Sequence, residues 1–216
     1  MKVWKSFIIA LFGTITALPI MGQSADVVTV GTVAGVAGSA VDVPVYIRDV
    51  SGTPLGMDQP FGSRIQSYGI TVNYPTAAIQ SVTFTRAGIT APLTPSFESN
   101  PSTPGSITLL DVFQESTNLI PFTSNAPAPG NQIGVLHVVI SPAAPAGPLT
   151  LTLASTLTQL SNQSGTITER TTLSTLQLVS GAIAVSQPTP VPALSPWALT
   201  VMALLIGVTA LIVLRR

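Results

Sequence analysis

The chain has 216 residues, no cysteine and a formal net charge of zero, and 46 % of its residues are hydrophobic while only 7 % are charged. Soluble domains average roughly 25 % charged residues, so the composition excludes a uniformly soluble chain and indicates membrane-directed segments. The lack of cysteine excludes disulfides and thiolate metal sites.

The first 25 residues have the layout of a secretory signal peptide. Lys2 and Lys5 precede an apolar run from Phe7 to about Ile20, and small and polar residues follow it. The apolar run is shorter than a typical membrane span. We therefore expect a signal peptide helix in residues 1–25, cut between Gly22 and Ala25 after export. An uncleaved N-terminal anchor is the alternative.

Charge is divided unevenly between the terminal segments and the body. Both lysines lie in the signal, and Arg215 and Arg216 end the chain. The remainder carries four arginines against eight acids, a net charge of −4. An acidic body without lysine has no basic surface for phosphates, which excludes nucleic acid as a partner.

Alternating apolar and polar side chains predict about nine β-strands between residues 26 and 186. Val41, Val43, Val45 and Ile47 share one face of such a strand, and Pro44 places it at a sheet edge because proline donates no hydrogen bond. The remaining expected strands are 27–33, 68–74, 82–84, 107–113, 133–140, 149–153, 173–179 and 182–185. Two long connections, 91–106 and 121–132, interrupt the pattern. Without interleaved helices, it predicts an all-β fold, a single jelly-roll β-sandwich over residues 26–186.

The order of motifs in this body resembles that of cohesin domains. Residues 28–31 and 38–45 are similar to their first two strands, 70–75 and 79–84 to the next pair, 135–140 and 145–151 to a late strand and its proline–glycine turn, and 178–185 to the closing strand. Tyr74 stands where cohesins commonly have aspartate. The resemblance implies a jelly-roll related to carbohydrate-binding modules. It also implies non-catalytic binding, since cohesins bind dockerin modules in assemblies that degrade polysaccharides.

No catalytic or metal constellation emerges from the polar residues. His137, the only histidine, alternates with Leu136 and Val138 and is expected on the surface. Asp111 and Glu115 are close enough in sequence for a glycosidase pair, but we interpret them as a solvated loop face. Asp49 and Asp58 bracket a loop that two acids alone do not make into a calcium site. We therefore predict no enzyme activity, no cofactor and no metal.

Aromatic side chains are the remaining candidates for ligand binding. The body has no tryptophan, which disfavours a flat polysaccharide platform. Tyr46 is expected on the outer face of its strand, whereas Tyr68 and Tyr74 share an apolar stripe and are expected in the core. Phe61, Phe97 and Phe122 fall in loops, where they either form a ligand surface with Tyr46 or plug the ends of the sandwich.

The last 30 residues predict a linker and a membrane segment. Residues 187–196 contain four prolines, which favour an extended spacer. Trp197 to Leu214 is an uncharged apolar run, about 27 Å long as a helix, which just spans the hydrocarbon layer. Arg215 and Arg216 would then stay in the cytoplasm. We expect residues 197–216 to form a transmembrane helix in the inner membrane, with the body outside the cytoplasm.

The same segment resembles the IPTL-type C-terminal sorting signals of Gram-negative bacteria, which are similar to the PEP-type signals handled by exosortases. The residues that carry the resemblance are Val191, Pro192, Ala193, Leu194, Trp197, Arg215 and Arg216. Val-Pro-Ala-Leu replaces the usual Ile-Pro-Thr-Leu, and Ala198 replaces a common glycine. The resemblance implies a sorting protease of exosortase type as a partner, and release to the cell surface or extracellular matrix.

The function expected from the sequence is an exported, envelope-anchored module without catalysis that binds a glycan or a surface protein. A purely structural protein of the exopolysaccharide or biofilm matrix is the alternative. A polysaccharide hydrolase is the third reading, and it would depend on Asp111 or Glu115.

Overall fold

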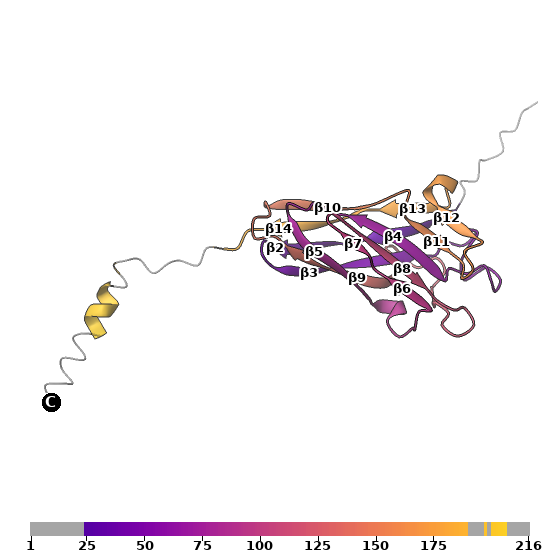
Figure 1. The fold of residues 1–216 in the computed structure, drawn as a ribbon, viewed down its shortest axis with the longest axis horizontal. Helices are drawn as coiled ribbons and strands as arrows, with labels where there is room; N and C mark the ends of the chain where they lie inside the picture. Colours follow the sequence, from indigo (N-terminus) through magenta and orange to yellow (C-terminus); the bar gives the residue numbers. More distant parts are fainter. Residues whose placement is uncertain (1–23, 190–196, 198–199, 207–216) are drawn as a thin grey trace, which may run out of the picture.

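The computed structural model describes residues 24–189, 197 and 200–206, and it shows two β-sheets packed face to face (Figure 1). The first sheet has five strands whose inward side chains are valine, leucine, isoleucine and phenylalanine. In spatial order they are β13 (Leu176–Val179), β1 (Asp26–Val30), β3 (Ala40–Arg48), β9 (Asn131–Ile140) and β5 (Ile79–Arg86).

The second sheet is larger and is centred on β4 (Ser67–Asn73). Its main path is β12 (Thr168–Arg170), β11 (Gln159–Ser161), β4, β10 (Gly147–Leu153), β14 (Gly181–Ser186) and β2 (Thr32–Val36). β8 (Ser106–Val112) pairs with β4 along its full length, and the short β6 (Phe97–Ser99) and β7 (Ser102–Thr103) pair with β8. Two short 3-10 helices, η1 (Gly88–Thr90) and η2 (Thr171–Leu173), lie in connections.

All nine predicted strands are present, and the described residues form fourteen strands in total. The predicted strand 27–33 switches sheets at Gly31, so that β1 lies in the first sheet and β2 in the second. The chain switches sheets in the same way between β13, which lies in the first sheet, and β14, which lies in the second. β6, β7, β11 and β12 have only two or three residues each, too few for alternation to reveal them.

The prediction that Pro44 places β3 at a sheet edge is wrong for the strand as a whole. β3 lies between β1 and β9 in the middle of the first sheet. Gly31 N donates to Pro44 O at 2.8 Å, so the missing amide of Pro44 faces the point where the chain leaves β1 for the other sheet. The proline therefore removes a donor only where the β1 ladder ends.

One continuous core fills the space between the sheets. Its buried members run from Val28 to Val185, and the largest fully buried side chain is Tyr68. The core expectation is confirmed for Tyr68, whereas Tyr74 is only half-buried at the end of β4. Because this core lies within residues 24–189, that segment, here called the body, has what it needs to fold alone.

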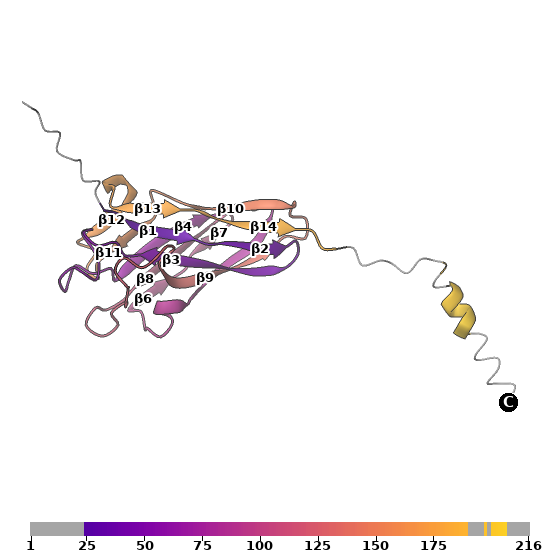
Figure 2. The same ribbon diagram turned by 180° about the vertical axis from the view of Figure 1, so that it is seen from behind.

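The chain enters and leaves the sandwich at opposite ends (Figures 1 and 2). One end, here called the N-terminal end, is where β1 begins at Asp26, beside the last residue of β3. The long connections 49–66 and 113–130 lie at this end too, because they follow the last residues of β3 and β8. Gln187, just after β14, donates to Ala144 O at the other, C-terminal end. The tight turns β2–β3, β4–β5 and β9–β10 gather there.

The predicted signal peptide helix lies outside the described residues. Of the predicted transmembrane helix, residues 197 and 200–206 are described and are helical. Within the part of the chain that the structure describes, no helix is long and apolar enough to cross a membrane.

Candidate binding surfaces

The four aromatic residues predicted to bind a ligand do not form one surface. Tyr46 is half-buried on the outer side of the first sheet, between buried Val45 and Ile47. Phe61 and Phe97 are 68 % and 50 % exposed. The ligand-surface expectation for Phe122 is wrong, since its side chain is buried in the core at the N-terminal end. It plugs the sandwich because the 121–130 connection folds back over that end.

Phe97 belongs to the second sheet, and the strands beside it present an uncharged outer surface. Phe97 lies directly opposite Val112 in the β6–β8 ladder, so both side chains share the outer side. The Thr71 and Thr108 hydroxyls contact each other at 2.9 Å on the same side. This surface, here called the neutral face, comprises outward positions of β8 and β10 and the last residue of β4: Asn73, Ser106, Thr108, Leu110, Val112, Pro148, Thr150 and Thr152. Ser67, Gly69 and Thr71 of β4 also point outward, but they are buried beneath it.

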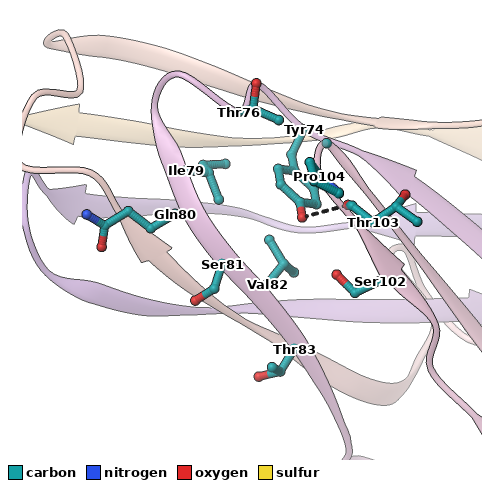
Figure 3. A pocket seen from close by; sticks show the side chains of 11 residues that line it. Tyr74, Thr76, Ile79, Gln80, Ser81, Val82, Thr83, Ser102, Thr103 and Pro104 are labelled. Carbon is teal, nitrogen blue, oxygen red and sulfur yellow. Dashed lines mark hydrogen bonds between the residues drawn. The ribbon is translucent and has the colours of Figure 1, made fainter.

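A hollow of about 550 Å³ opens beside Tyr74 at the C-terminal end of the sandwich (Figure 3). It separates the free edge of β5, from Ile79 to Thr83, from the turn between β7 and β8. Tyr74 forms one wall, and its hydroxyl donates to Thr103 O at 3.3 Å. The lining offers five serine and threonine hydroxyls and no charged group: Thr76, Ser81, Thr83, Ser102 and Thr103.

Tyr74 also lines a second hollow, of about 440 Å³. Pro75 and Pro148 line it together with Asn73, Thr150 and Thr152, which belong to the neutral face. Tyr74 therefore lines two uncharged hollows, one of which continues into the neutral face. This residue was assigned to the core from its sequence, and its place just before Pro75 was the signal for a strand end.

His137 is exposed, as predicted, and forms a pair with an acid that the sequence did not link to it. Its Nδ1 lies 2.8 Å from Asp42 Oδ1 across the β3–β9 ladder, and both side chains are more than half exposed. An exposed pair on a flat sheet encloses no substrate. Thr83 lies directly opposite His137 on β5, but no hydrogen bond joins the two side chains among the described residues, so the His137–Asp42 pair has the geometry of a surface contact.

Asp111 is buried, which corrects the prediction of a solvated loop face. It accepts a hydrogen bond from the Tyr68 hydroxyl inside the sandwich. Burial raises the pKa of Asp111 to about 6, while the Tyr68 hydrogen bond opposes that rise. The sequence contained the signal: Asp111 is in phase with inward-facing Ile107, Leu109 and Phe113.

Glu115 is also buried, at 5 % exposure, which corrects the prediction for the second acid of this pair. Its Oε2 accepts the Gly62 amide at 2.9 Å, and its Oε1 lies 3.7 Å from Arg64 Nε. Glu115 thus fixes the 49–66 connection to the end of β8. Because its contacts and those of Asp111 are structural, the two acids do not form a carboxylate pair across a cleft.

A buried carboxyl pair that sequence reasoning missed lies at the N-terminal end. Asp26 and Glu169 are both fully buried and lie close enough for each to affect the pKa of the other. Asp26 Oδ1 also accepts the Val50 amide at 2.7 Å, and Glu169 Oε1 accepts the Leu55 amide at 2.9 Å. Burial, followed by the interaction with Glu169, raises the pKa of Asp26 to about 10, and burial also raises that of Glu169. Because two buried acids this close cannot both be charged without a large cost, we expect the pair to hold one proton at neutral pH.

Across residues 24–189, 197 and 200–206, no three histidine or acidic side chains are grouped as metal ligands. The carboxyl groups found there hold loops and strand ends together. The neutral face and the Tyr74 hollows offer uncharged side chains that are suited to a protein or glycan ligand.

Comparison with known proteins identifies both parts of the chain. The family described as the IPTL-CTERM motif matches residues 189–216, so the chain ends in such a motif. None of the curated proteins matches the chain.

Solved cohesin structures have the same fold as the body. The third cohesin of the scaffoldin ScaC from Acetivibrio cellulolyticus, solved with a dockerin, is 19 % identical, covers 74 % of this chain and 98 % of its own, and has a TM-score of 0.54. The seventh type I cohesin of ScaB from Pseudobacteroides cellulosolvens is 16 % identical, with coverages of 79 % and 97 % and a TM-score of 0.52. A Clostridium acetobutylicum cohesin is 19 % identical, with coverages of 76 % and 92 % and a TM-score of 0.51. The body is thus a cohesin-like β-sandwich.

Proposed function

We propose that this chain is an exported binding module without catalysis, that its C-terminal sorting motif directs it to the cell surface, and that its neutral face binds a protein. The observation that carries the proposal is the neutral face itself, with Phe97 at its edge. Several of the solved cohesins with this fold were captured with a dockerin module bound, which supports a protein as the partner.

The chemistry of the neutral face suits a protein surface more than a chain of sugars. Its side chains are uncharged, and its threonines lie on the same face as the apolar side chains of Leu110 and Val112. Phe97 adds a half-exposed ring at the rim. Interfaces are depleted of charge at their centres and enriched in aromatic side chains, as here.

The test compares three versions of the immobilised body: wild type, Phe97→Asp and Phe61→Asp. Phe61 is the matched control, since it is an exposed phenylalanine in the 49–66 connection and belongs to none of the strands that form the neutral face. Proteins from an envelope extract are captured and quantified, and direct binding of each purified candidate is then measured. We expect one partner that wild type and Phe61→Asp retain equally and that Phe97→Asp binds at least about tenfold more weakly.

Equal binding of that partner by all three proteins would contradict the placement of the site. The absence of any partner would favour the alternative, a purely structural protein of the extracellular matrix. Deletion of the gene would then change biofilm or cell-surface texture without loss of any binding activity. The third reading, a hydrolase, conflicts with the structural contacts of Asp111 and Glu115.

The Tyr74 hollows favour a second candidate function, the binding of an uncharged glycan. Five hydroxyl groups and one aromatic wall supply the hydrogen bonds and the apolar contact that a neutral sugar uses. A glycan array with the body is the direct test. Binding that Tyr74→Ala abolishes and Phe97→Asp leaves unchanged would establish this site as separate from the neutral face.

The terminal segments complete the proposal. Residues 1–25 export the chain, 26–186 form the binding module, 187–196 space it from the membrane, and 197–216 hold it in the inner membrane until processing. The IPTL-CTERM motif supports sorting by an exosortase-type protease. Because the chain leaves the sandwich at the C-terminal end, the long connections at the N-terminal end would point away from the membrane.

A further inference from the structure

Two carboxylates of the 49–66 connection converge on Gly56. A Cβ atom at residue 56 would lie 2.5 Å from Asp49 Oδ1 and 2.8 Å from Asp58 Oδ1, so both oxygens contact the same side of this glycine. Gly56 also has φ of +146°, a conformation that other residues rarely adopt. The loop is therefore built to bring two negatively charged oxygens together, which costs free energy unless something positive lies between them.

The other oxygen of each carboxylate is fixed by the loop backbone. Asp49 Oδ2 accepts the Met57 amide at 2.9 Å and the Ser124 hydroxyl at 3.0 Å. Asp58 Oδ2 accepts the Gly52 amide at 3.0 Å. These bonds orient the two Oδ1 atoms toward Gly56 and leave them as the oxygens available to a ligand.

Asp49 Oδ1 is a buried oxygen without a partner. The Asp49 side chain is fully buried, and no described residue donates a hydrogen bond to this atom. Buried carboxylate oxygens almost always have a donor or a cation. Asp58 is exposed and lies between Asp49 and solvent, so a small ion has a path to both oxygens.

Other acids lie near Asp49, and Arg64, the one cation of the 49–66 connection, contacts Gln59 O at 3.5 Å and Glu115 Oε1 at 3.7 Å instead. The Asp26–Glu169 pair lies behind Asp49, and its charge interacts with that of Asp49. The ion pairs among the described residues are Arg64–Glu115, Arg86–Glu98 and His137–Asp42, and none includes Asp49 or Asp58. Burial and the Asp58 charge raise the pKa of Asp49, as expected of an acid that lacks a countercharge.

We propose that Asp49 Oδ1 and Asp58 Oδ1 bind a divalent cation of the calcium type at the N-terminal end of the sandwich. Calcium takes six to eight oxygen ligands, and two carboxylates supply only part of that shell. Water completes the rest, so the site is weak, with Kd of about 10⁻⁴–10⁻³ M, the range of extracellular modules. The cation would anchor the 49–66 connection, which carries Phe61.

The test measures thermal unfolding of the body in EDTA and in 10 mM CaCl₂ or MgCl₂ at equal ionic strength. Calcium is expected to raise Tm by about 5 °C, because a ligand that binds only the folded state stabilises it by mass action. Magnesium should give less than half of that shift, since it requires a tighter octahedral shell. Calorimetric titration with CaCl₂ should give Kd in the same range.

Two variants decide whether the effect belongs to this site. Asp58→Asn keeps a side-chain oxygen but removes the charge of one ligand at an exposed position, and it should reduce the calcium shift to less than half. Asp42→Asn removes an equally exposed acid on β3 and should keep the full shift. A wild-type body that calcium stabilises no more than magnesium does, or an Asp58→Asn body with an undiminished calcium shift, would overturn the proposal.

Discussion

Asp26 and Glu169 lie together inside the sandwich, where the first strand begins beside β12, and we expect the pair to hold one proton at neutral pH. Asp26 binds the Val50 amide and Glu169 binds the Leu55 amide, so the pair fastens the 49–66 connection to the two ends of the body's sequence. A shared proton between buried acids makes folding stability depend on pH.

The stability of the body should fall as pH rises. The pKa of Asp26 is about 10 in the folded chain and 3.8 ordinarily, so between these values unfolding releases a proton. The free energy of unfolding therefore decreases with rising pH, by up to about 1 kcal/mol per pH unit. Asp26→Asn mimics the protonated acid, and urea unfolding of it should show no such slope between pH 7 and 9.

Asp111 does not contribute to this pH dependence, because its pKa of about 6 places its effect on the free energy of unfolding below pH 7. Asp42→Asn, an exposed substitution, should keep the wild-type slope. If the wild-type body were equally stable at pH 7 and 9, the expectation that Asp26 and Glu169 hold a proton in the folded state would be wrong.

Tyr68→Phe should destabilise the body in a manner that depends on pH. It removes the hydroxyl that donates to buried Asp111, and an unpaired buried carboxylate costs about 1–3 kcal/mol. The loss should be larger at pH 8 than at pH 5, where Asp111 accepts a proton instead. Tyr74→Phe, which removes a surface hydrogen bond, should change the free energy of unfolding by less than about 0.5 kcal/mol. Equal losses for Tyr68→Phe at both pH values would contradict this account.

Gly134 on β9 should not tolerate a side chain. A Cβ there would meet the ring of Phe84 on the neighbouring β5, so Gly134→Ala should cost about 1–3 kcal/mol through overpacking. Gly69 on β4 is the control, since its Cβ would lie 3.7 Å from Leu110 Cδ1, an ordinary contact. Comparable denaturation midpoints for the two variants would show that the Phe84 ring moves aside.

The sorting motif predicts that the mature protein lacks its C-terminus. Intact-mass analysis of the protein recovered from the cell surface should give a mass that ends between Pro192 and Trp197 and begins after Gly22 to Ala25. A mass that retains Arg216 would identify the segment as a plain anchor. Mutating Arg215 and Arg216 to alanine should leave the body folded, since the core lies within residues 24–189.

Alternation along the chain was sufficient to predict the sandwich, because strands with one buried face repeat every second residue. Val43, Val45 and Ile47 lie in the core as that pattern required. The alternation could not predict that the chain changes sheets at Gly31, since β1 and β2 have a similar composition on both sides of the glycine.

The candidate surfaces were harder to predict because they depend on contacts between distant segments. Asp111 was assigned to solvent by its charge, although its phase placed it in the core. Asp49 and Asp58 looked too few for a cation, and only the folded loop shows that both reach Gly56. Phe97 lies within the predicted connection 91–106, and only its pairing with β8 places it beside the neutral face.

Site-specific photo-crosslinking in the intact cell tests the central claim, that the neutral face binds a protein. A photoreactive phenylalanine analogue replaces Phe97 in one strain, Thr150 in a second, and Phe61 in a third. The proposed function predicts that the first two positions crosslink to the same protein and that position 61 does not. Crosslinks of equal yield at all three positions, or none at positions 97 and 150, would contradict it.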